Sequence, residues 1–524
     1  MKDSSLSLVH DDAHRLKTTV RIGLALVTLG FAALLLAWLQ WQKAYSLFIS
    51  VGAMAAIVAG TVIYSRGRYA GLPAGIKNNG IRMMSLTSRG ALAWLSAVIL
   101  TGFYVLLYWF PAYLGQGENG AANSGLIAVF DPLSQFFKKQ PASQWFVYGV
   151  LYTVLILALG VKFMYKYRHN RYQLVRTASV MFFQTAFAFL LPELLLRFNQ
   201  PFYDFKNMWP LNTYFTDGWF IQQVTGAGSL GLFMLIWGVL MIFVISPVLT
   251  YFYGKRWYCS WVCGCGGLAE TTGDPFRHLS DKSLRGWNIE RGLIHVVLFF
   301  SVVMSLAVLY SFFLNSGDAY WVTRSFLVYA VSVLFTGLGA WLFFRRNKFQ
   351  SVEPRYIYYM LGAGAVILAL LWRAYWTDSA NMLFIDSGNV RKFYGFWIGA
   401  AFSGVVGVGF YPILGSRVWC RFGCPMAAIL GLQQKLLSRF RITVNGGQCI
   451  SCGNCSAYCE MGIDVRHYAQ RGQDVVRASC VGCGICAAVC PRGVLRLEGA
   501  STDIDMRTQQ LRSIHVMYED VRIL

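Results

Sequence analysis

The sequence predicts an all-α polytopic membrane domain of about ten transmembrane helices, followed by a small α+β domain. Two observations predict this division. First, 56% of the 524 residues are hydrophobic and only 13% are charged, whereas an average soluble protein carries about 25% charged residues. Second, eight of the 13 cysteines stand in two closely spaced runs after the last apolar stretch. Such spacing is typical of metal ligands in a reducing compartment and not of a disulfide scaffold.

The apolar stretches define the membrane domain, because a helix needs about 20 mostly apolar residues to cross a bilayer. The stretches that qualify are 22–40, 45–64, 91–111, 145–164, 177–196, 230–252, 293–314, 325–344, 356–373 and 394–413. We therefore divide the chain into a cytoplasmic N-terminal segment (1–21), a transmembrane domain (22–440), a cysteine-rich domain (441–500) and a C-terminal tail (501–524).

The basic residues predict the orientation of the spans. The formal net charge is +22, and the lysines and arginines gather in alternate connections between spans, as at Arg66 and Arg68 and again at Arg345 and Arg346. Because cytoplasmic loops are enriched in lysine and arginine, we expect both termini in the cytoplasm and the chain in the bacterial cytoplasmic (inner) membrane. This distribution makes the lipid bilayer the expected partner and argues against nucleic acid.

Two pairs of matching segments predict an internal repeat. Residues 167–175 follow the fourth span and match 344–352 after the eighth, and residues 254–263 follow the sixth span and match 415–424 after the tenth. All four segments lie on the predicted cytoplasmic side, so we expect parallel repeats related by an axis along the membrane normal. Spans three to six then correspond to spans seven to ten, and the first two spans are an addition.

The two C-terminal cysteine runs share the spacing C-x2-C-x2-C-x3-C. This is the spacing of bacterial-type dicluster ferredoxins, in which the fourth cysteine of each run ligates the cluster of the other run. We therefore expect two 4Fe–4S clusters, one bound by Cys449, Cys452, Cys455 and Cys490 and the other by Cys480, Cys483, Cys486 and Cys459. The alternative is a pair of zinc sites, but zinc sites rarely use this spacing of eight cysteines.

Glu460 departs from the ferredoxin pattern, since it replaces the proline expected after Cys459, whereas Pro491 follows Cys490. We expect the substitution to alter the turn. We also expect it to place a negative charge near a cluster, which would lower the reduction potential.

A second candidate site is formed by two C-x3-C motifs, Cys259 with Cys263 and Cys420 with Cys424. If the two halves are related by symmetry, the pairs face each other where the spans meet the cytoplasm. Four thiolates there would bind an iron–sulfur cluster or another soft metal. The alternatives are that each pair is a redox dithiol or that the cysteines are inert. Cys265 is an uncertain member, because it is a ready substitute for Cys263 as a ligand.

The similarity of the two C-x3-C motifs extends to the residues that precede them. An arginine, Arg256 or Arg417, precedes each motif, together with a glycine and an aromatic residue. A nearby arginine favours the thiolate form of a cysteine, so we expect both arginines to offset negative charge at the site.

Other redox cofactors find little support in the sequence. The motif C-x-x-C-H is missing, which excludes c-type haem, and His295 is the one histidine within a predicted span, whereas haem b held between two histidines needs two. We find no threonine motif for covalent flavin.

Glu193 lies in the fifth span, where a carboxylate is costly and indicates function. It is either a proton acceptor for a quinol or the partner of Arg197.

Together, the spans, the paired C-x3-C motifs and the dicluster pattern resemble the NosR/NapH/CcoG group of membrane polyferredoxins. The resemblance implies an electron-transfer component of an oxidoreductase system, linking a quinol or cytoplasmic donor to a partner redox protein. It equally admits an assembly factor that reduces a metal or thiol; a redox sensor or transporter subunit is a further alternative. The chain departs from the group at Gly264, which replaces a proline, at Cys265, and in its larger number of spans.

Overall fold

The computed structural model describes residues 17–39, 45–70, 84–118, 121–317, 319–320, 322–346 and 354–498. The predicted tail and most of the predicted N-terminal segment lie outside these ranges. Within them, nine helices are long and apolar enough to cross a membrane. In lipid the backbone groups must be satisfied internally, which a helix achieves along its whole length. The predicted fold class, an all-α membrane domain with a small ferredoxin-like domain after it, is confirmed.

The nine helices match the first nine predicted spans. They are α1 (Thr18–Trp38), α2 (Ser46–Tyr69), α4 (Ala91–Trp109), α7 (Gln144–Lys166), α8–η4–α9 (Arg171–Arg197), α11–η6–α12 (Gly228–Tyr253), α15 (Leu284–Ser316), α16 (Arg324–Phe344) and α17 (Pro354–Trp376). Shorter helices connect them outside the motifs: α3 (Met84–Thr87), η3 (Pro111–Leu114), α5 (Gly125–Val129), α6 (Asp131–Lys138), η5 (Thr213–Thr216), α10 (Gly218–Thr225) and η7 (Asp274–Leu279).

The tenth predicted span lies on a helix that starts earlier than expected. Helix α18 (Ser387–Tyr394) continues directly into η9 (Gly395–Val406), and a turn then leads to α19 (Tyr411–Leu414). The helix therefore includes Arg391 and Lys392 in its first turns, which the hydropathy pattern assigns to a loop. η9 is a π-helical segment, as is η6 (Met241–Ile245) at the corresponding place of the other half.

Prolines account for two of the π-helical segments, in which the helical turns are wider than in an α-helix. Pro192 and Pro247 follow the π-helical segments η4 (Phe183–Leu190) and η6 by two residues. A proline inside a helix lacks an N–H and its ring crowds the preceding turn, and a π-turn is one of the few ways to relieve this.

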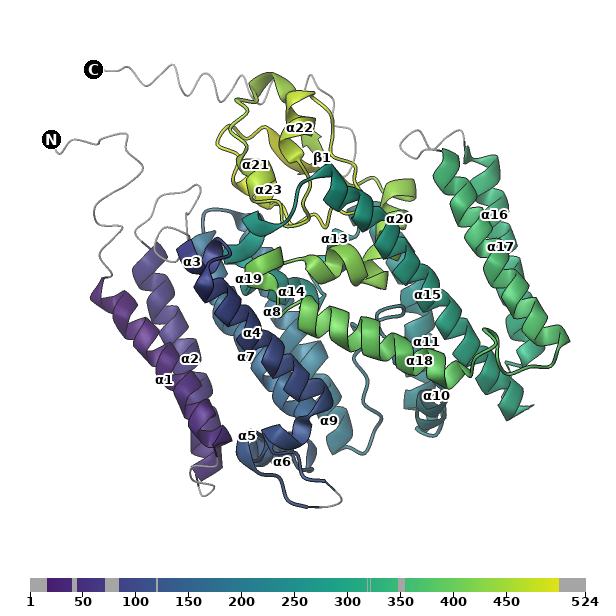
Figure 1. Cartoon of the computed structure of the whole chain (residues 1–524), viewed down its shortest axis with the longest axis horizontal. Coiled ribbons are helices and arrows are strands. Elements are labelled where there is room, and N and C mark those ends of the chain that lie inside the picture. The colour runs from purple at the N-terminus through teal and green to yellow at the C-terminus, as the bar shows by residue number, and fades with distance from the viewer. Residues whose placement is uncertain are drawn as a thin grey trace.

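Helices α1 and α2 pack as a close pair at one flank of the membrane domain (Figure 1). A Cβ added to Gly23 would lie 2.7 Å from the carbonyl oxygen of Gly60, and the reverse distance is also 2.7 Å. Small residues at a membrane helix interface allow this backbone approach. Helices α16 and α17 form a second pair at the opposite flank, and the remaining spans lie between the two pairs.

The small domain follows α20 (Pro425–Leu437) and sits above the ends of the membrane helices (Figure 1). Its two strands, β1 (Arg441–Val444) and β2 (Leu495–Glu498), pair antiparallel with Arg441 opposite Glu498. The short helices η11 (Gly446–Gln448), α21 (Asn454–Ala457), α22 (Val465–Gln470) and α23 (Ile485–Ala488) lie between the strands in sequence. The sheet thus joins both ends of the domain and holds the two cysteine runs together.

Candidate metal centres

The two C-terminal cysteine runs adopt the same unusual backbone conformation at equivalent positions. Three pairs of residues share a positive φ: Ser451 and Gly482 (56° and 62°), Gly453 and Gly484 (78° and 74°), and Gly462 and Gly493 (65° and 63°). Residues other than glycine rarely adopt this backbone conformation. Its occurrence at Ser451 therefore indicates that the shape of the loop is fixed by the run as a whole. Each run is therefore a tight loop, and the two loops have matching backbone turns.

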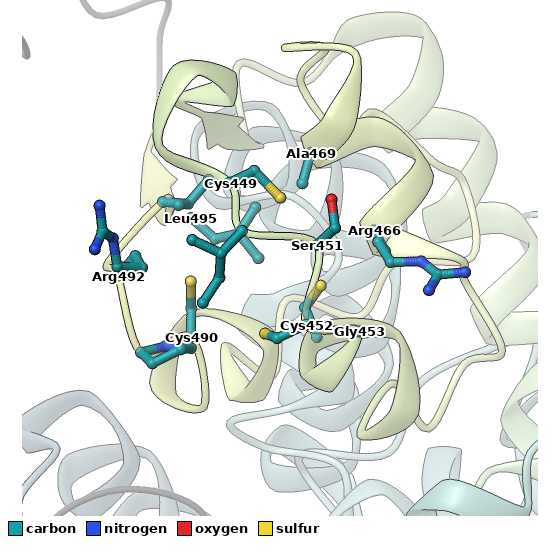
Figure 2. Close-up of a pocket in the computed structure, with 13 residues that line it drawn as sticks. Cys449, Ser451, Cys452, Gly453, Arg466, Ala469, Cys490, Arg492 and Leu495 are labelled. Atoms are coloured by element: carbon teal, nitrogen blue, oxygen red, sulfur yellow. The ribbon is translucent and has the colours of Figure 1, made fainter.

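The first predicted ligand set lines a single pocket. Cys449, Cys452 and Cys455 of the first run share it with Cys490, the fourth cysteine of the second run (Figure 2). We call these four residues the outer set. Cys455 is buried and Cys452 is exposed, so the pocket opens to solvent on the Cys452 side.

The second predicted ligand set is also brought together, but away from solvent. Its members are Cys459, Cys480, Cys483 and Cys486, which we call the inner set. Burial raises the pKa of the Cys486 thiol, and the neighbouring thiols Cys483, Cys480 and Cys459 raise it further. The backbone N–H of Ile463 donates to Cys459 Sγ at 3.4 Å. Thiols grouped in this way, with an N–H donor beside them, fit a cluster whose sulfurs accept hydrogen bonds.

The inner set rests directly on the membrane domain. Four hydrogen bonds fix its loop to membrane-domain side chains: Tyr172 Oη to Gly482 O (2.8 Å), Gln173 Nε2 to Cys483 O (2.8 Å), Ser260 Oγ to Val481 O (2.8 Å) and Gln434 Nε2 to Cys480 O (3.0 Å). Each partner on the ferredoxin side is a backbone carbonyl, so the thiols remain available to a metal.

The two C-x3-C motifs repeat the same local structure. They lie on α13 (Arg256–Cys259) with the start of α14 (Gly264–Thr271), and on η10 (Trp419–Gly423) with the start of α20. The glycine that begins each motif has a positive φ, 65° at Gly254 and 95° at Gly415. Cys263 and Cys424 each cap the following helix in an extended conformation. The predicted repeat is thus visible in the backbone of the motifs.

The structure brings the two motifs together in one buried place. Cys259, Cys263, Cys420 and Cys424 are all buried in a single apolar cluster, and we call them the C-x3-C set. Arg417 bridges the motifs, since its Nη1 lies 3.7 Å from Cys420 Sγ and donates to the carbonyl oxygen of Cys259 at 3.2 Å. The same apolar cluster includes or contacts every cysteine of the chain except Cys452. The three sets therefore form one continuous group.

The two equivalent arginines have different roles, contrary to the sequence prediction. Arg417 contacts the C-x3-C set, whereas Arg256 lies over the ring of Phe440, with its guanidinium carbon 4.5 Å from the ring centre. Burial raises the pKa of Cys259 to about 12, and the cation that opposes this most strongly is Lys255. Ser416 occupies the position equivalent to Lys255, so the two halves supply positive charge from different positions.

Cys265 adds a fifth thiol to the C-x3-C set. It packs against the same apolar cluster. Its hydrogen bond with Cys263 lowers the pKa of Cys263, although burial acts in the opposite direction. Because Cys263 and Cys265 are adjacent in space, either thiol can serve as the fourth ligand. The structure thus leaves both residues as candidates, as the sequence does.

A buried ion network separates the C-x3-C set from the inner set, and sequence analysis missed most of it. Glu460 accepts from Arg277 Nη1 at 2.6 Å and from Arg417 Nε at 2.9 Å. Glu270 pairs with Arg417 at 2.5 Å and with Arg176. All five side chains are buried. The signal that sequence analysis overlooked is Glu270, a carboxylate within a segment of small and apolar residues directly after the first C-x3-C motif.

The network shows how the charge of Glu460 is held near the inner set. Its carboxylate lies near the inner set, since ligand atoms of Glu460, Glu270 and Cys483 fall within 4.8 Å of one another. Burial acts to raise the pKa of Glu460, but Arg277 and Arg417 outweigh it and lower the pKa. The ionised carboxylate therefore lies near a cysteine of the inner set, and Arg277 and Arg417 pair with it. That Glu460 lowers the reduction potential of a cluster stays a prediction.

Glu193 also has a different partner from the predicted one. Its carboxylate lies 3.8 Å from Lys138 Nζ on α6, while Arg197 donates to the carbonyl oxygen of Phe136. A buried carboxylate with a cationic neighbour is accounted for by charge pairing, so this residue gives no support to a quinol site.

Two families of known proteins match parts of the chain. The family described as "4Fe-4S dicluster domain" matches residues 448–495, which include both C-terminal runs. The family described as "4Fe-4S binding domain" matches twice, at residues 235–283 and 396–443, and each match includes one C-x3-C motif. With its span-capable helices, the chain is therefore a multi-pass membrane protein that carries iron–sulfur domains.

One curated relative is similar over a short segment. It is the "Putative electron transport protein YccM" of Escherichia coli (strain K12), which is 43% identical over 49 residues. The match covers 9% of this chain and 13% of the relative, so the similarity is confined to a small part of both proteins. No solved structure matches the chain.

Proposed function

We propose that this chain is a membrane-bound iron–sulfur protein that passes electrons between a quinol or cytoplasmic donor and a partner oxidoreductase. The observation that carries the proposal is the row of three cysteine sets, from the outer set with its exposed Cys452, through the inner set, to the buried C-x3-C set. Electron tunnelling slows steeply with distance, and neighbouring sites keep each step short. The printed name of the relative, an electron transport protein, supports the same assignment.

The cysteine sets suit iron–sulfur clusters, which supply one-electron chemistry when bound. We assign one 4Fe–4S cluster each to the outer and inner sets, and a third cluster or another soft metal to the C-x3-C set. The family matches to both C-x3-C segments support the third assignment. The chain offers N–H donors to the sulfurs, as Ala427 N does to Cys424 Sγ at 3.4 Å, and Arg417 offsets thiolate charge.

The proposed orientation places all three sets at the cytoplasmic face of the inner membrane. Reporter proteins fused after Arg68 or Arg346 are expected to behave as cytoplasmic, and fusions after Asp217 or Asp386 as external, because of the basic bias of the loops. Alkaline phosphatase and fluorescent-protein fusions measure this directly. External activity from the Arg68 and Arg346 fusions would contradict the proposed orientation.

Electron transfer itself is tested with the full chain purified anaerobically and placed in nanodiscs. We expect the visible absorbance of the clusters to bleach on addition of a low-potential soluble donor and to recover with an added electron acceptor. A parallel reaction with a reduced quinone analogue tests the quinol as donor. A chain that contains its clusters but neither accepts nor releases electrons in any of these reactions would overturn the proposal.

One observation favours a second function, that of a maturation factor which reduces a metal or thiol. Cys263 and Cys265 are hydrogen-bonded and give the C-x3-C set one thiol more than a four-coordinate site uses. Reduction of added copper(II) or of a disulfide substrate, with no reaction toward quinol, would favour this function. The same activity should then be lost in the variant Cys265→Ser.

A further inference from the structure

The outer set opens onto a surface whose exposed charges have one sign. In the described part of the ferredoxin-like domain, residues 441–498, every exposed charged side chain is an arginine: Arg466, Arg471 and Arg492. Arg466 and Arg492 line the pocket of the outer set and stand on opposite sides of it (Figure 2).

None of the carboxylates of the domain is among its exposed side chains, and three of them are half-buried and hydrogen-bonded within the domain. Asp464 accepts from Ser456 Oγ at 2.6 Å, Asp474 from the N–H of Val444 at 3.1 Å, and Glu498 from Thr443 Oγ1 at 2.5 Å. Together with Glu460, which is buried in the ion network, these are all the acidic residues of 441–498. The surface around the outer set therefore presents positive charge with little acidic compensation.

Part of this surface lies away from the membrane. Helix α22, which carries Arg466, lies at the end of the domain farthest from the membrane helices (Figure 1). The inner set is enclosed between its own domain and the membrane domain, whereas Cys452 of the outer set is exposed. A second protein can thus approach closest to the row of cysteines at the outer set.

We propose that the face formed by Cys452, Ile450, Arg466 and Arg492 docks a soluble electron-carrier protein whose redox centre is surrounded by acidic side chains. Guanidinium groups pair well with carboxylates, and opposite charges accelerate association. Ile450, which is 57% exposed, supplies an apolar contact within the charged rim, as is usual for interfaces.

This inference rests on the proposed function, because it assumes that the outer set holds a redox-active cluster. The step is the transfer of one electron from the reduced carrier, which is oxidised by one electron, to the cluster of the outer set, which is reduced by one. No bond forms or breaks. The carrier then dissociates, and an interface of modest size with a charged rim allows fast exchange.

The test uses reduced flavodoxin, an acidic carrier, as the donor to the full chain in nanodiscs of neutral lipid. We expect the variant Arg466→Glu/Arg492→Glu to lower the second-order rate constant about tenfold or more at low salt, because charge steering of this kind changes on-rates by about 10–1,000-fold. The dependence of the rate on ionic strength should flatten as well. Arg66→Glu/Arg68→Glu is the matched control, with the same charge change at the end of α2, and should react like the wild type.

Two further measurements keep the result interpretable. The clusters of each variant are counted by iron content and by reduction with dithionite, both of which should equal those of the wild type. If flavodoxin reacts equally fast with wild type and variant, the docking face is wrong while the proposed function stands. If the variant differs only in nanodiscs of phosphatidylglycerol, the arginines bind lipid, which also overturns the inference. A wild type without clusters would instead overturn the proposed function.

Discussion

Replacing both Cys259 and Cys420 with serine is expected to remove about four iron atoms per chain and leave about eight, since each cubane cluster contains four. One ligand is lost from each C-x3-C motif, and the remaining thiols of Cys263, Cys265 and Cys424 are one fewer than the four that bind a cubane cluster. The outer and inner sets keep all eight of their cysteines. Iron and sulfide analysis of anaerobically purified protein measures the difference, and Mössbauer spectra show which class of iron disappears.

The variants Cys263→Ser and Cys265→Ser serve as a pair of single-residue controls. If Cys263 is the ligand, Cys265→Ser should keep the iron content of the wild type, and Cys263→Ser should lose the cluster or keep it through Cys265. An unchanged iron content in Cys259→Ser/Cys420→Ser would show that the motifs hold no iron. A soft metal other than iron or a pair of redox dithiols would then be the remaining functional alternatives; metal analysis tests the first, and thiol alkylation before and after reduction tests the second.

Replacing Arg417 with alanine is expected to destabilise the protein by about 3–5 kcal/mol, the usual effect of removing one partner from a buried ion pair. Arg417 is 1% exposed and pairs with both Glu270 and Glu460. Without it, Glu270 keeps Arg176 and Glu460 keeps Arg277, but each buried carboxylate loses a direct hydrogen bond. Thermal unfolding in detergent, followed by tryptophan fluorescence, measures the loss.

The repeat provides the matched control for this variant. Arg256 occupies the equivalent position in the first half, is half-buried, and packs on Phe440 with no ion pair to a carboxylate in the described residues. Arg256→Ala should therefore lower the unfolding temperature much less than Arg417→Ala. Equal effects of the two substitutions would show that the ion network contributes no special stability.

The fold was largely predictable because its signals are local. A run of about 20 apolar residues needs no tertiary information to be recognised as a span, and the eight cysteines keep a spacing that a tight loop imposes. The helix of the tenth span was placed several residues too late, because Arg391 and Lys392 interrupt the apolar run although they belong to the helix. A hydropathy pattern shows where apolar residues begin, whereas the helix begins where its backbone hydrogen bonds begin, at Ser387.

The parts of the site that were missed depend on contacts between distant segments. Glu460 lies next to a cysteine in sequence, but its partners Arg277 and Arg417 come from two separate connections of the membrane domain. Nothing in the local sequence distinguishes Arg277 from the basic residues that mark a cytoplasmic loop. Likewise, the repeat makes Arg256 and Arg417 equivalent, and only tertiary contacts separate their roles: Arg417 pairs with Glu270 and Glu460, whereas Arg256 packs on Phe440.

The central claim is that the C-terminal cysteines hold two 4Fe–4S clusters close enough to exchange electrons. A reductive titration of the full chain, purified anaerobically and followed by electron paramagnetic resonance, tests it most directly. We predict signals of reduced 4Fe–4S clusters that broaden as the second cluster is reduced, because the outer and inner sets are neighbours within one small domain. Stoichiometric zinc without sulfide, or signals from clusters that never interact, would contradict the claim.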